Sequence, residues 1–397
     1  MPISNKIKSA LDRGSWIRKM FEEGDRLKAK LGAENVYDFS LGNPYSEPPE
    51  DFLNELKRIV NDRTPGMHRY MANAGFIETR ETIARVLAED SGMDFKWDHI
   101  TMCCGAGGGL NVVLKAILDP GDEVIVLTPF FVEYRFYIDN HGGICLEVST
   151  NERFEIDLDA LDHAINSKTR AVIINSPNNP TGVIYNSGSL KGLDRLLKKK
   201  EKELGSVIYV ISDEPYKKLA YDGIEPPDIF KLIDNSIVVT SHSKDLSIPG
   251  ERIGYIAISP KAADIGDLIN GITFSNRTLG FVNAPALMQR VVANLQRACV
   301  DVNDYQEKRD LFYESLTEMG YEIVKPQGAF YLFPKSPLED DVAFVKEAQN
   351  KNILVVPGSG FGTPGYFRIT YCVEKRCIED SLKGFEELAL ECGLKGK

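Results

Sequence analysis

The sequence lacks an excess of basic residues. Its 397 residues include 47 lysines and arginines against 58 aspartates and glutamates, which gives a formal net charge of −11 at pH 7. A protein that binds nucleic acid through a general basic surface has the opposite balance, because that surface must neutralise phosphates. The composition therefore argues against a nucleic-acid partner. The densest basic run, "LLKKKEKEL" (196–204), is typical of the solvated end of an amphipathic helix.

The sequence also lacks long apolar runs and paired cysteines. No stretch approaches the roughly 20 residues of a membrane span, and the opening segment "MPISNKIKSALDRGSW" has no apolar signal-peptide core. The seven cysteines are an odd number without a C-x-x-C pair, which disfavours a disulfide framework and a structural zinc site. Cys103 and Cys104 are expected to be buried thiols in a strand. We therefore expect a soluble, reduced, cytoplasmic protein without a bound metal.

What the sequence does contain is a series of short apolar, β-branched runs separated by helical patterns. Nearly continuous apolar strands suit a sheet that helices cover on both faces, and segments with helical spacing supply the crossovers. Ligands of such open α/β sheets collect outside the carboxyl ends of the strands, where this chain places polar residues. The runs are 123–127, 171–175, 206–212, 236–241 and 252–259.

From about residue 283 the pattern changes to that of an α+β module. One long helix is expected over 283–320, followed by short strands, a helix and a final helix from about 375. The predicted fold class is α/β, with a large domain whose mostly parallel mixed sheet is sandwiched by helices, and a smaller α+β domain. The predicted division is an N-terminal segment that packs with the small domain (1–45), a large domain (46–285) and a small domain (286–397).

A glycine-rich turn follows one predicted strand in "TMCCGAGGGLNVVLKAIL" (101–118). Gly105, Ala106 and Gly107 would let backbone amides approach an anion at the start of a helix, where the helix dipole also favours negative charge. A plain tight turn fits this segment equally well. A Rossmann fingerprint is excluded because Leu110 stands where the third glycine belongs.

Two further strand ends carry polar residues. In "SPNNPTGVIY" two prolines stiffen the turn around Asn179, although alone this is only a loop. In "ISDEPYKKL" Asp213 ends an apolar run and Tyr216 follows three residues later. A buried carboxylate needs a partner, whereas an isolated aspartate at this position is more often a helix cap.

The stretch "SHSKDLSIPGER" (241–252) places Lys244 beside small hydroxyls and eight residues before an arginine. Most single lysines are exposed, but this one directly follows a β-branched strand. Burial and nearby cations lower the pKa of a lysine and make its amine a competent nucleophile and base. An anion cradle, an amine that can form an imine and a buried carboxylate are together what pyridoxal phosphate requires.

Read in order, these motifs resemble the fold-type I pyridoxal-phosphate aminotransferases of the aspartate-aminotransferase-like class. The resemblance covers nearly the whole chain. The motifs that carry it are "FSLGNP", "YMANAGFIETRETIA", "CGAGGGLNVVLKAILDPGDEV", "SPNNPTG", "SDEPY", "SHSK" with Arg252, "PQGAFYLF", "PGSGFG" and "FRITY".

The resemblance implies roles for the catalytic residues. Lys244 would form the internal aldimine and later move a proton. Asp213 would pair with the pyridine nitrogen and keep it protonated, while Tyr216 and Asn179 would donate to the phenolic oxygen. Phe131 matches the aromatic residue that stacks on the ring, although the family usually has Trp or Tyr there.

The resemblance also implies how phosphate and substrate are held. The phosphate would be bound by the backbone amides of Ala106 and Gly107, in the turn that begins at Gly105, and by Ser241, Ser243 and Arg252. Tyr70 would reach the phosphate of the neighbouring subunit, which implies a homodimer with shared active sites. Arg368 would grip the substrate α-carboxylate, with room left by Gly42 and a further contact from Asn179.

The sequence departs from the family at the pocket for the substrate side chain. Dicarboxylate-specific members have a second cationic residue there. This chain has Gly271 where one subgroup has an arginine and Gly107 where another has a lysine, and Arg277 is out of register with both. Aromatic, aliphatic or other acidic substrates stay open. The expected activity is transfer of an α-amino group from an L-amino acid to a 2-oxo acid by a ping-pong mechanism. The alternatives are a β-C–S lyase, another lyase or decarboxylase with the same cofactor, or a ligand-sensing regulator.

Overall fold

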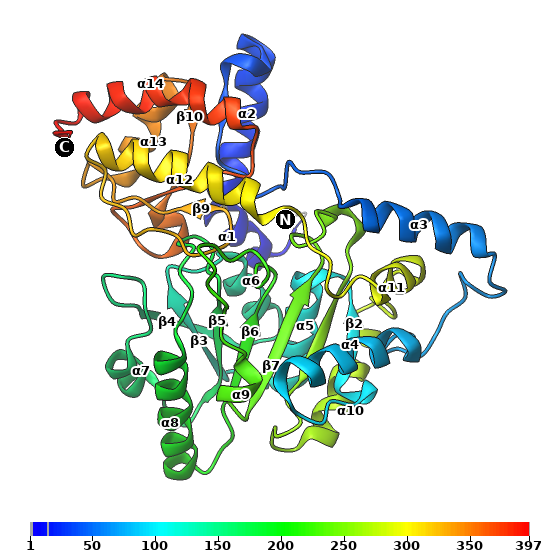
Figure 1. Cartoon of the computed structure of the whole chain (residues 1–397). Coiled ribbons are helices and arrows are strands. Elements are labelled where there is room, and N and C mark those ends of the chain that lie inside the picture. The colour runs from blue at the N-terminus through cyan, green and yellow to red at the C-terminus, as the bar shows by residue number, and fades with distance from the viewer. Residues whose placement is uncertain (1–2, 14–15, 397) are drawn as a thin grey trace.

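A computed structural model describes residues 3–13 and 16–396. A seven-stranded sheet forms the centre of its larger part (Figure 1), in the order β2-β8-β7-β6-β5-β3-β4. Strand β8 is antiparallel to both neighbours and the other pairs are parallel, so the predicted mostly parallel mixed sheet is confirmed. The strands are β2 (Ile100–Cys103), β3 (Glu123–Thr128), β4 (Ile144–Ser149), β5 (Thr169–Asn175), β6 (Tyr209–Asp213), β7 (Ser236–Ser241) and β8 (Gly254–Ile258).

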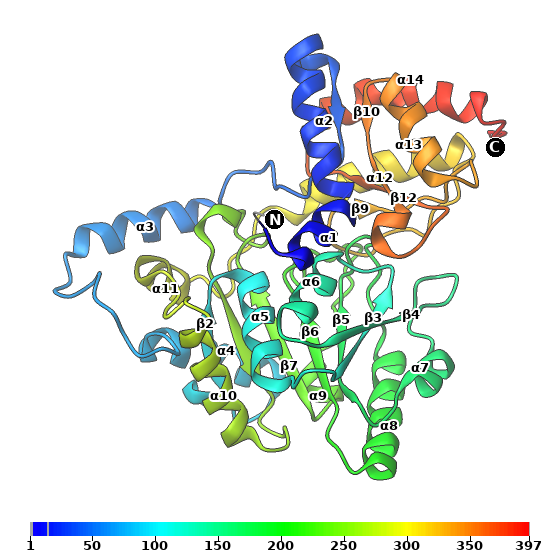
Figure 2. The same cartoon turned by 180° about the vertical axis from the view of Figure 1, so that it is seen from behind.

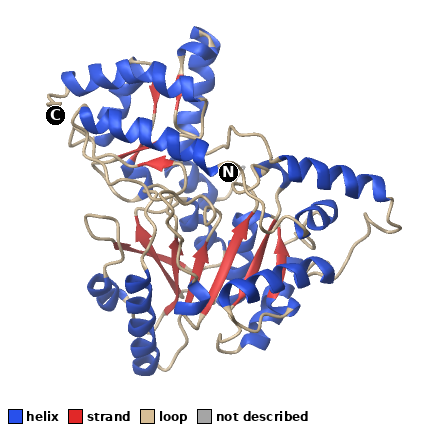
Figure 3. Cartoon of the chain, viewed as in Figure 1, coloured by secondary structure: helices blue, strands red, loops and turns tan. Residues whose placement is uncertain are grey.

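Helices cover both faces of this sheet (Figures 2 and 3). Strand residues alternate between the two faces, so Val124 and Val126 of β3 enter one apolar core while Ile125 and Leu127 enter the other. The first face is covered by α5 (Gly105–Ile117), α6 (Glu133–Asn140) and α10 (Ile265–Thr278). The second face is covered by α3 (Glu50–Asp62), α4 (Ile77–Ser91), α7 (Leu158–Ala164), α8 (Ser187–Leu204), α9 (Ile229–Leu232) and α11 (Ala286–Ala293).

Helix α8 shows how the sequence sets helix ends. The side-chain oxygen of Asn186 accepts a hydrogen bond of 2.9 Å from the backbone N–H of Ser189, which satisfies a donor of the first turn. The helix ends at Gly205, whose φ of 70° suits a residue without a Cβ atom. Leu193 and Leu197 are buried while the lysine-rich positions face outward, as expected for an amphipathic helix.

The C-terminal residues form a separate, smaller α+β part. Its apolar core contains Phe312, Phe344, Phe367 and Phe385. Helices α12 (Val302–Glu318), α13 (Asp341–Asn350) and α14 (Lys375–Glu391) pack on two small sheets. One sheet is the parallel pair β1 (Tyr37–Asp38) and β10 (Ile353–Leu354), and the other is antiparallel with β11 (Val356–Pro357), β12 (Phe367–Thr370) and β9 (Tyr331–Leu332).

The single long helix expected over 283–320 is wrong, because the segment forms α11 and α12 with an irregular stretch between them. Asp301 ends this stretch, and its side chain accepts a hydrogen bond from the Asn303 backbone at the start of α12. The backbone N–H of Val300 is held by the Asp245 carbonyl. Helix α11 packs into the core of the large sheet, whereas α12 packs in the small part.

The N-terminal residues connect to both parts. Helix α2 (Trp16–Leu31) contributes Met20 to the small core, and Phe39 is buried there too. Helix α1 (Asn5–Arg13) contacts α6, because Lys6 pairs with Asp139 at 2.9 Å. Cys103 lies in β2 as expected, but Cys104 stands outside the strand, one residue before α5. Within residues 3–13 and 16–396, no helix has both the length and the apolar character needed to span a bilayer.

Candidate active site

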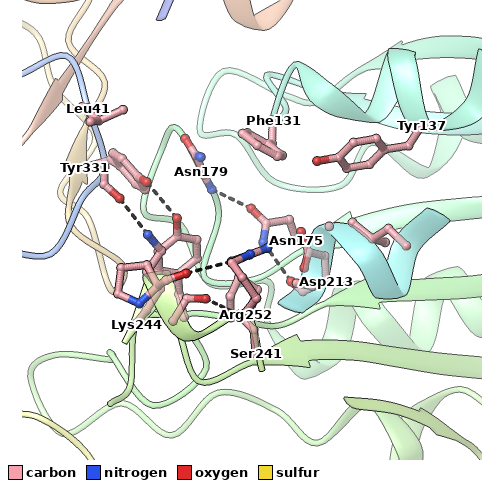
Figure 4. Close-up of a pocket in the computed structure, with 18 of the residues that line it drawn as sticks. Leu41, Phe131, Tyr137, Asn175, Asn179, Asp213, Ser241, Lys244, Arg252 and Tyr331 are labelled. Carbon is pink, nitrogen blue, oxygen red and sulfur yellow. Dashed lines mark hydrogen bonds between the residues drawn. The ribbon is translucent and has the colours of Figure 1, made fainter. Parts of the chain in front are cut away.

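A cavity of about 280 Å³ lies where the large sheet meets the small part. The carboxyl ends of β5, β6 and β7 supply Asn175, Asp213 and Ser241, and the small part supplies Tyr331 (Figure 4). Arg368 also comes from the small part. The full lining is Leu41, Gly42, Ala106, Gly107, Leu110, Phe131, Tyr137, Asn175, Asn179, Asp213, Pro215, Tyr216, Ser241, Ser243, Lys244, Pro249, Arg252, Tyr331 and Arg368.

The amine of Lys244 points into this cavity from the loop after β7. Its Nζ donates a hydrogen bond of 2.7 Å to the carbonyl oxygen of Gly42. Burial and, to a smaller extent, the positive charges of Arg252 and Arg368 lower the pKa of Lys244 to about 8, against an opposing effect of Cys372. A substantial fraction of this amine is therefore neutral near pH 8 and able to act as a nucleophile or a base.

Asp213 is a buried carboxylate with one oxygen unpaired. The Tyr134 hydroxyl donates to its Oδ2 at 2.6 Å, and Asn175 Nδ2 donates to its backbone oxygen at 2.8 Å. Its Oδ1 has no hydrogen-bond partner among the described residues. Burial raises the pKa of Asp213 to about 7, while the Tyr134 hydrogen bond acts in the opposite direction. The site thus holds an acceptor that a cationic N–H group would satisfy.

Two asparagines connect the sheet to Arg368. The Asn175 side chain accepts a hydrogen bond of 2.7 Å from the Asn179 backbone, and Arg368 Nη1 donates to Asn179 Oδ1 at 3.0 Å. Arg368 Nη2 donates to the Ser40 carbonyl, and its Nε has no partner in the described chain. Only 2% of Arg368 is exposed. A buried guanidinium with a free N–H is suited to bind a carboxylate.

A pair of tyrosines forms another wall of the cavity. The hydroxyls of Tyr216 and Tyr331 are 2.7 Å apart and share a hydrogen bond. Tyr331 Oη also lies so close to Gly42 that a Cβ atom there would overlap it. A glycine at position 42 therefore allows the N-terminal segment to cover the cavity.

The opposite end of the cavity is suited to an anion. Ala106 and Gly107 lie in the first turn of α5, and the hydroxyls of Ser241 and Ser243 are 3.2 Å apart. Arg252 donates to the Pro249 carbonyl at 3.0 Å and directs its guanidinium toward the same turn. Backbone amides, hydroxyls and an arginine form a donor set typical of phosphate sites.

All predicted site residues except Gly105 and Tyr70 line the cavity. Gly105 lies directly behind it, since a Cβ atom on this residue would meet the Arg252 guanidinium at 2.5 Å. Tyr70 is 88% exposed on the surface of its own chain. Gly271, on α10, and Arg277, which is exposed and stacks on Phe274, do not line the cavity either.

The residues of the site that were not predicted from the sequence include Leu41, Tyr134, Tyr137, Asn175 and Tyr331. Asn175 had a usable signal, because it is the polar residue that ends the apolar run "AVIIN". Tyr137 had none, since its hydroxyl is placed by tertiary packing against Gly107, where a Cβ atom would lie 3.0 Å away. That contact also shows why a long side chain at position 107 would not fit without displacing Tyr137.

The donor set fits pyridoxal phosphate. The orphaned Asp213 Oδ1 suits a protonated pyridine nitrogen, the serine and arginine end suits a phosphate, and Lys244 offers an amine to an aldehyde. Phe131 lines the cavity beside Tyr134, with ring centroids 5.7 Å apart and an edge-to-face angle of 85°. Its ring is thus fixed as an apolar surface for an aromatic ligand.

Comparison with known proteins agrees with this chemistry. Residues 34–383 match the family model "Aminotransferase class I and II". A probable aspartate aminotransferase of Methanocaldococcus jannaschii is 31% identical over 394 residues, 97% of this chain and 99% of that protein. The aspartate aminotransferase of Thermotoga maritima is 33% identical over 377 residues, 94% of this chain and 96% of that protein.

The fold is likewise shared with solved structures. The crystal structure of an amino transferase from Eubacterium rectale superposes with a TM-score of 0.96 at 41% identity, over 99% of this chain and all of that one. The match of the family model over nearly the whole chain and these similarities agree with the cavity described above. The chain belongs to the class I and II aminotransferases and is a pyridoxal-phosphate-dependent enzyme of that family.

Proposed function

We propose that the enzyme transfers the α-amino group of an L-amino acid to a 2-oxo acid in two half-reactions at the one cavity, the ping-pong scheme of covalent catalysis. The observation that carries the proposal is the meeting of Lys244, Asp213 and Arg368 in that cavity. Lys244 follows β7, Asp213 ends β6 and Arg368 lies on β12. The pKa of Lys244 is lowered, and Asp213 Oδ1 and Arg368 Nε have no hydrogen-bond partner among the described residues.

Different residues of the chain would bind different parts of the cofactor. When bound, pyridoxal phosphate supplies an electron sink for the charge that develops at the substrate Cα. Asp213 would hold the pyridine nitrogen protonated through Oδ1, and Tyr216 and Asn179 would donate to the phenolic oxygen. Phe131 would cover a ring face. The phosphate would be bound by Ala106, Gly107, Ser241, Ser243 and Arg252.

Lys244 has two tasks in this scheme. Its amine would hold the cofactor in the resting enzyme, and once free it would accept the proton that leaves the substrate Cα. Both tasks need a neutral amine, which the lowered pKa of about 8 supports. The Gly42 carbonyl, 2.7 Å away, holds the free amine inside the cavity.

Arg368 binds the substrate α-carboxylate, because its buried guanidinium offers an unpaired N–H beside Asn179. Selectivity for the side chain has to come from elsewhere. The lining drawn from the described residues contains three lysines or arginines, Lys244, Arg252 and Arg368, and each already has a task. The two curated relatives are named for aspartate, but a second carboxylate would have no cation in the cavity of one chain.

A panel of amino donors with 2-oxoglutarate and pyruvate as acceptors tests this selectivity. We expect aliphatic or aromatic donors to give a higher kcat/KM than aspartate, because an unpaired carboxylate is costly to bury. A clear preference for aspartate would mean that another chain supplies the missing cation.

We propose further that two chains share their active sites, with Tyr70 of each reaching the phosphate in the other. Its 88% exposure and its absence from the cavity of its own chain support this. The test mixes inactive Tyr70→Ala with inactive Lys244→Ala protein. In an equal mixture about half of the dimers are hybrids with one intact site of two, so about a quarter of the wild-type activity should return. No recovery after verified subunit exchange would contradict shared sites.

The main experiment is the Lys244→Ala variant. The wild-type protein should be yellow with pyridoxal phosphate, and the variant should lose both colour and transamination. Lys308→Ala is the matched control, since Lys308 is also buried, pairs with Asp304 and lies outside the cavity. Full turnover in Lys244→Ala would overturn the proposal, and release of ammonia and pyruvate from cystathionine by the wild type would favour a lyase.

A further inference from the structure

Tyr331 is buried in the cavity wall between the cofactor residues and the substrate residues. It lies on β9, only 2% of it is exposed, and it lines the cavity (Figure 4). Its hydroxyl contacts that of Tyr216. The oxygens of the two hydroxyls are 2.7 Å apart. Tyr331 therefore contacts the residue proposed to bind the phenolic oxygen, although it belongs to the other part of the fold.

Three neighbours fix the direction of the Tyr331 side chain. The Arg368 guanidinium lies 4.8 Å from the centre of its ring, and the Phe330 ring packs at 4.9 Å between centroids. Gly42 closes the third side, where any Cβ atom would overlap the hydroxyl. The hydroxyl is thus held against Tyr216 by packing on all sides rather than by a flexible contact.

The number of protons on the two hydroxyls decides which tyrosine donates to the other. Burial raises the pKa of Tyr331 to about 12 and that of Tyr216 well above its usual value, so both hydroxyls keep their protons at neutral pH. Either oxygen can be the donor within the pair. If Tyr216 donates its single proton to an anionic oxygen in the cavity, it can only accept from Tyr331.

We propose that Tyr331 is a positioning residue that donates its hydroxyl proton to Tyr216 and so aims and polarises the Tyr216 hydroxyl toward the phenolic oxygen of the cofactor. This role rests on the proposed function. Chains of hydrogen bonds polarise one another in a buried site, so Tyr216 becomes a stronger donor than it would be alone. Gly42 is part of this arrangement because it leaves room for the Tyr331 hydroxyl.

The experiment titrates the visible absorption band of the bound cofactor with pH, without any substrate. Tyr331→Phe keeps the ring over Arg368 and removes only the hydroxyl. Hydrogen bonds to an ionised oxygen favour the ionised form. Because the variant removes the donor behind Tyr216, the pH at the midpoint of the absorbance change should rise by about half a pH unit. An unchanged midpoint would overturn the role of Tyr331.

The matched control is Tyr321→Phe. Tyr321 is 3% exposed and donates one hydrogen bond of 3.1 Å to the Phe385 carbonyl in the small core, away from the cavity. Its loss should leave the midpoint unchanged. An equal shift in this control would assign the effect to general loosening of the small part and would contradict the proposal.

A double substitution tests whether Tyr331 acts through Tyr216. Tyr331→Phe should give no further shift in a Tyr216→Phe background, because coupled residues are not additive. A full additional shift would show a direct effect on the cofactor and overturn the positioning role. Gly42→Ala, which displaces the Tyr331 hydroxyl and leaves both tyrosines in place, should raise the midpoint in the same direction if Tyr331→Phe does not fold. A wild-type protein without any visible band would refute the proposed function itself.

Discussion

The two walls of the cavity are built differently. In the wall from the large sheet, Asn175, Asp213 and Ser241 are the last residues of three adjacent parallel strands. In the wall from the small part, Gly42 and Arg368 come from segments that lie far apart in the sequence. Each wall keeps one buried polar atom unpaired among the described residues, Asp213 Oδ1 in the first and Arg368 Nε in the second. The unpaired atoms have opposite charge, so the first wall suits a cationic ring nitrogen and the second a carboxylate.

The difference has a functional consequence. A change at Asp213 should affect the chemistry of the cofactor, whereas a change at Arg368 should affect binding of the substrate. Hydrogen bonds join the walls from Lys244 to Gly42, between Tyr216 and Tyr331, and from Arg368 to Asn179. Substitutions in each wall measure how far the two walls are separable.

The largest effect is expected for Asp213→Asn. Without the carboxylate the ring nitrogen loses its proton, and the charge at the substrate Cα is no longer stabilised, so kcat should fall by at least about 10³-fold. Single-turnover absorbance with an amino donor measures this step. Asp341→Asn is the control, because Asp341 is equally buried but bonds to Ser359 outside the cavity. A kcat within tenfold of the wild type would contradict the role of Asp213.

The same substitution should stabilise the protein without cofactor. Since burial raises the folded-state pKa of Asp213 from 3.8 to about 7, the folded state holds a proton that the unfolded state loses between these pH values. Wild-type stability therefore falls as pH rises from about 4 to 7, by up to about 4 kcal/mol. Urea unfolding at pH 8 should show Asp213→Asn as more stable, with the gain disappearing near pH 4. A gain that does not depend on pH would contradict the assigned pKa.

A smaller effect is expected in the second wall, for Arg368→Lys. Lysine keeps the charge but cannot bind a carboxylate as a fork, so kcat/KM should fall by about 10²-fold through KM, with the cofactor still bound. Steady-state kinetics and the visible band measure the two properties separately. The control is Arg309→Lys, a fully buried arginine that pairs with Asp222 outside the cavity. Loss of the cofactor in Arg368→Lys would show that the walls are not separable.

The sheet wall was the more predictable of the two. Apolar runs that end in polar residues place Asp213 and Ser241 at one sheet edge, because parallel strands end together. The resemblance to a known family added roles for Lys244 and Arg252. Local pattern alone left Asp213 open as a helix cap, and only the packing around it shows a buried oxygen without a partner.

The small wall was less predictable, for a physical reason. Tyr331 lies in "GAFYLF", where its neighbours Phe330 and Leu332 are apolar core residues too, so no periodicity distinguishes it. Its place beside Tyr216 depends on the packing of two parts of the fold. Tyr134 was missed for a similar reason, since its position in a helix gives no sign that its hydroxyl reaches Asp213.

Lys244 is the residue whose amine would hold the cofactor. Treatment of the yellow enzyme with borohydride makes the bond between cofactor and lysine permanent, and mass mapping of the peptides then locates it. We expect the added mass on the peptide that contains Lys244 and on no other lysine. Added mass on a different lysine, or an unlabelled Lys244 in an enzyme that transaminates, would contradict the account.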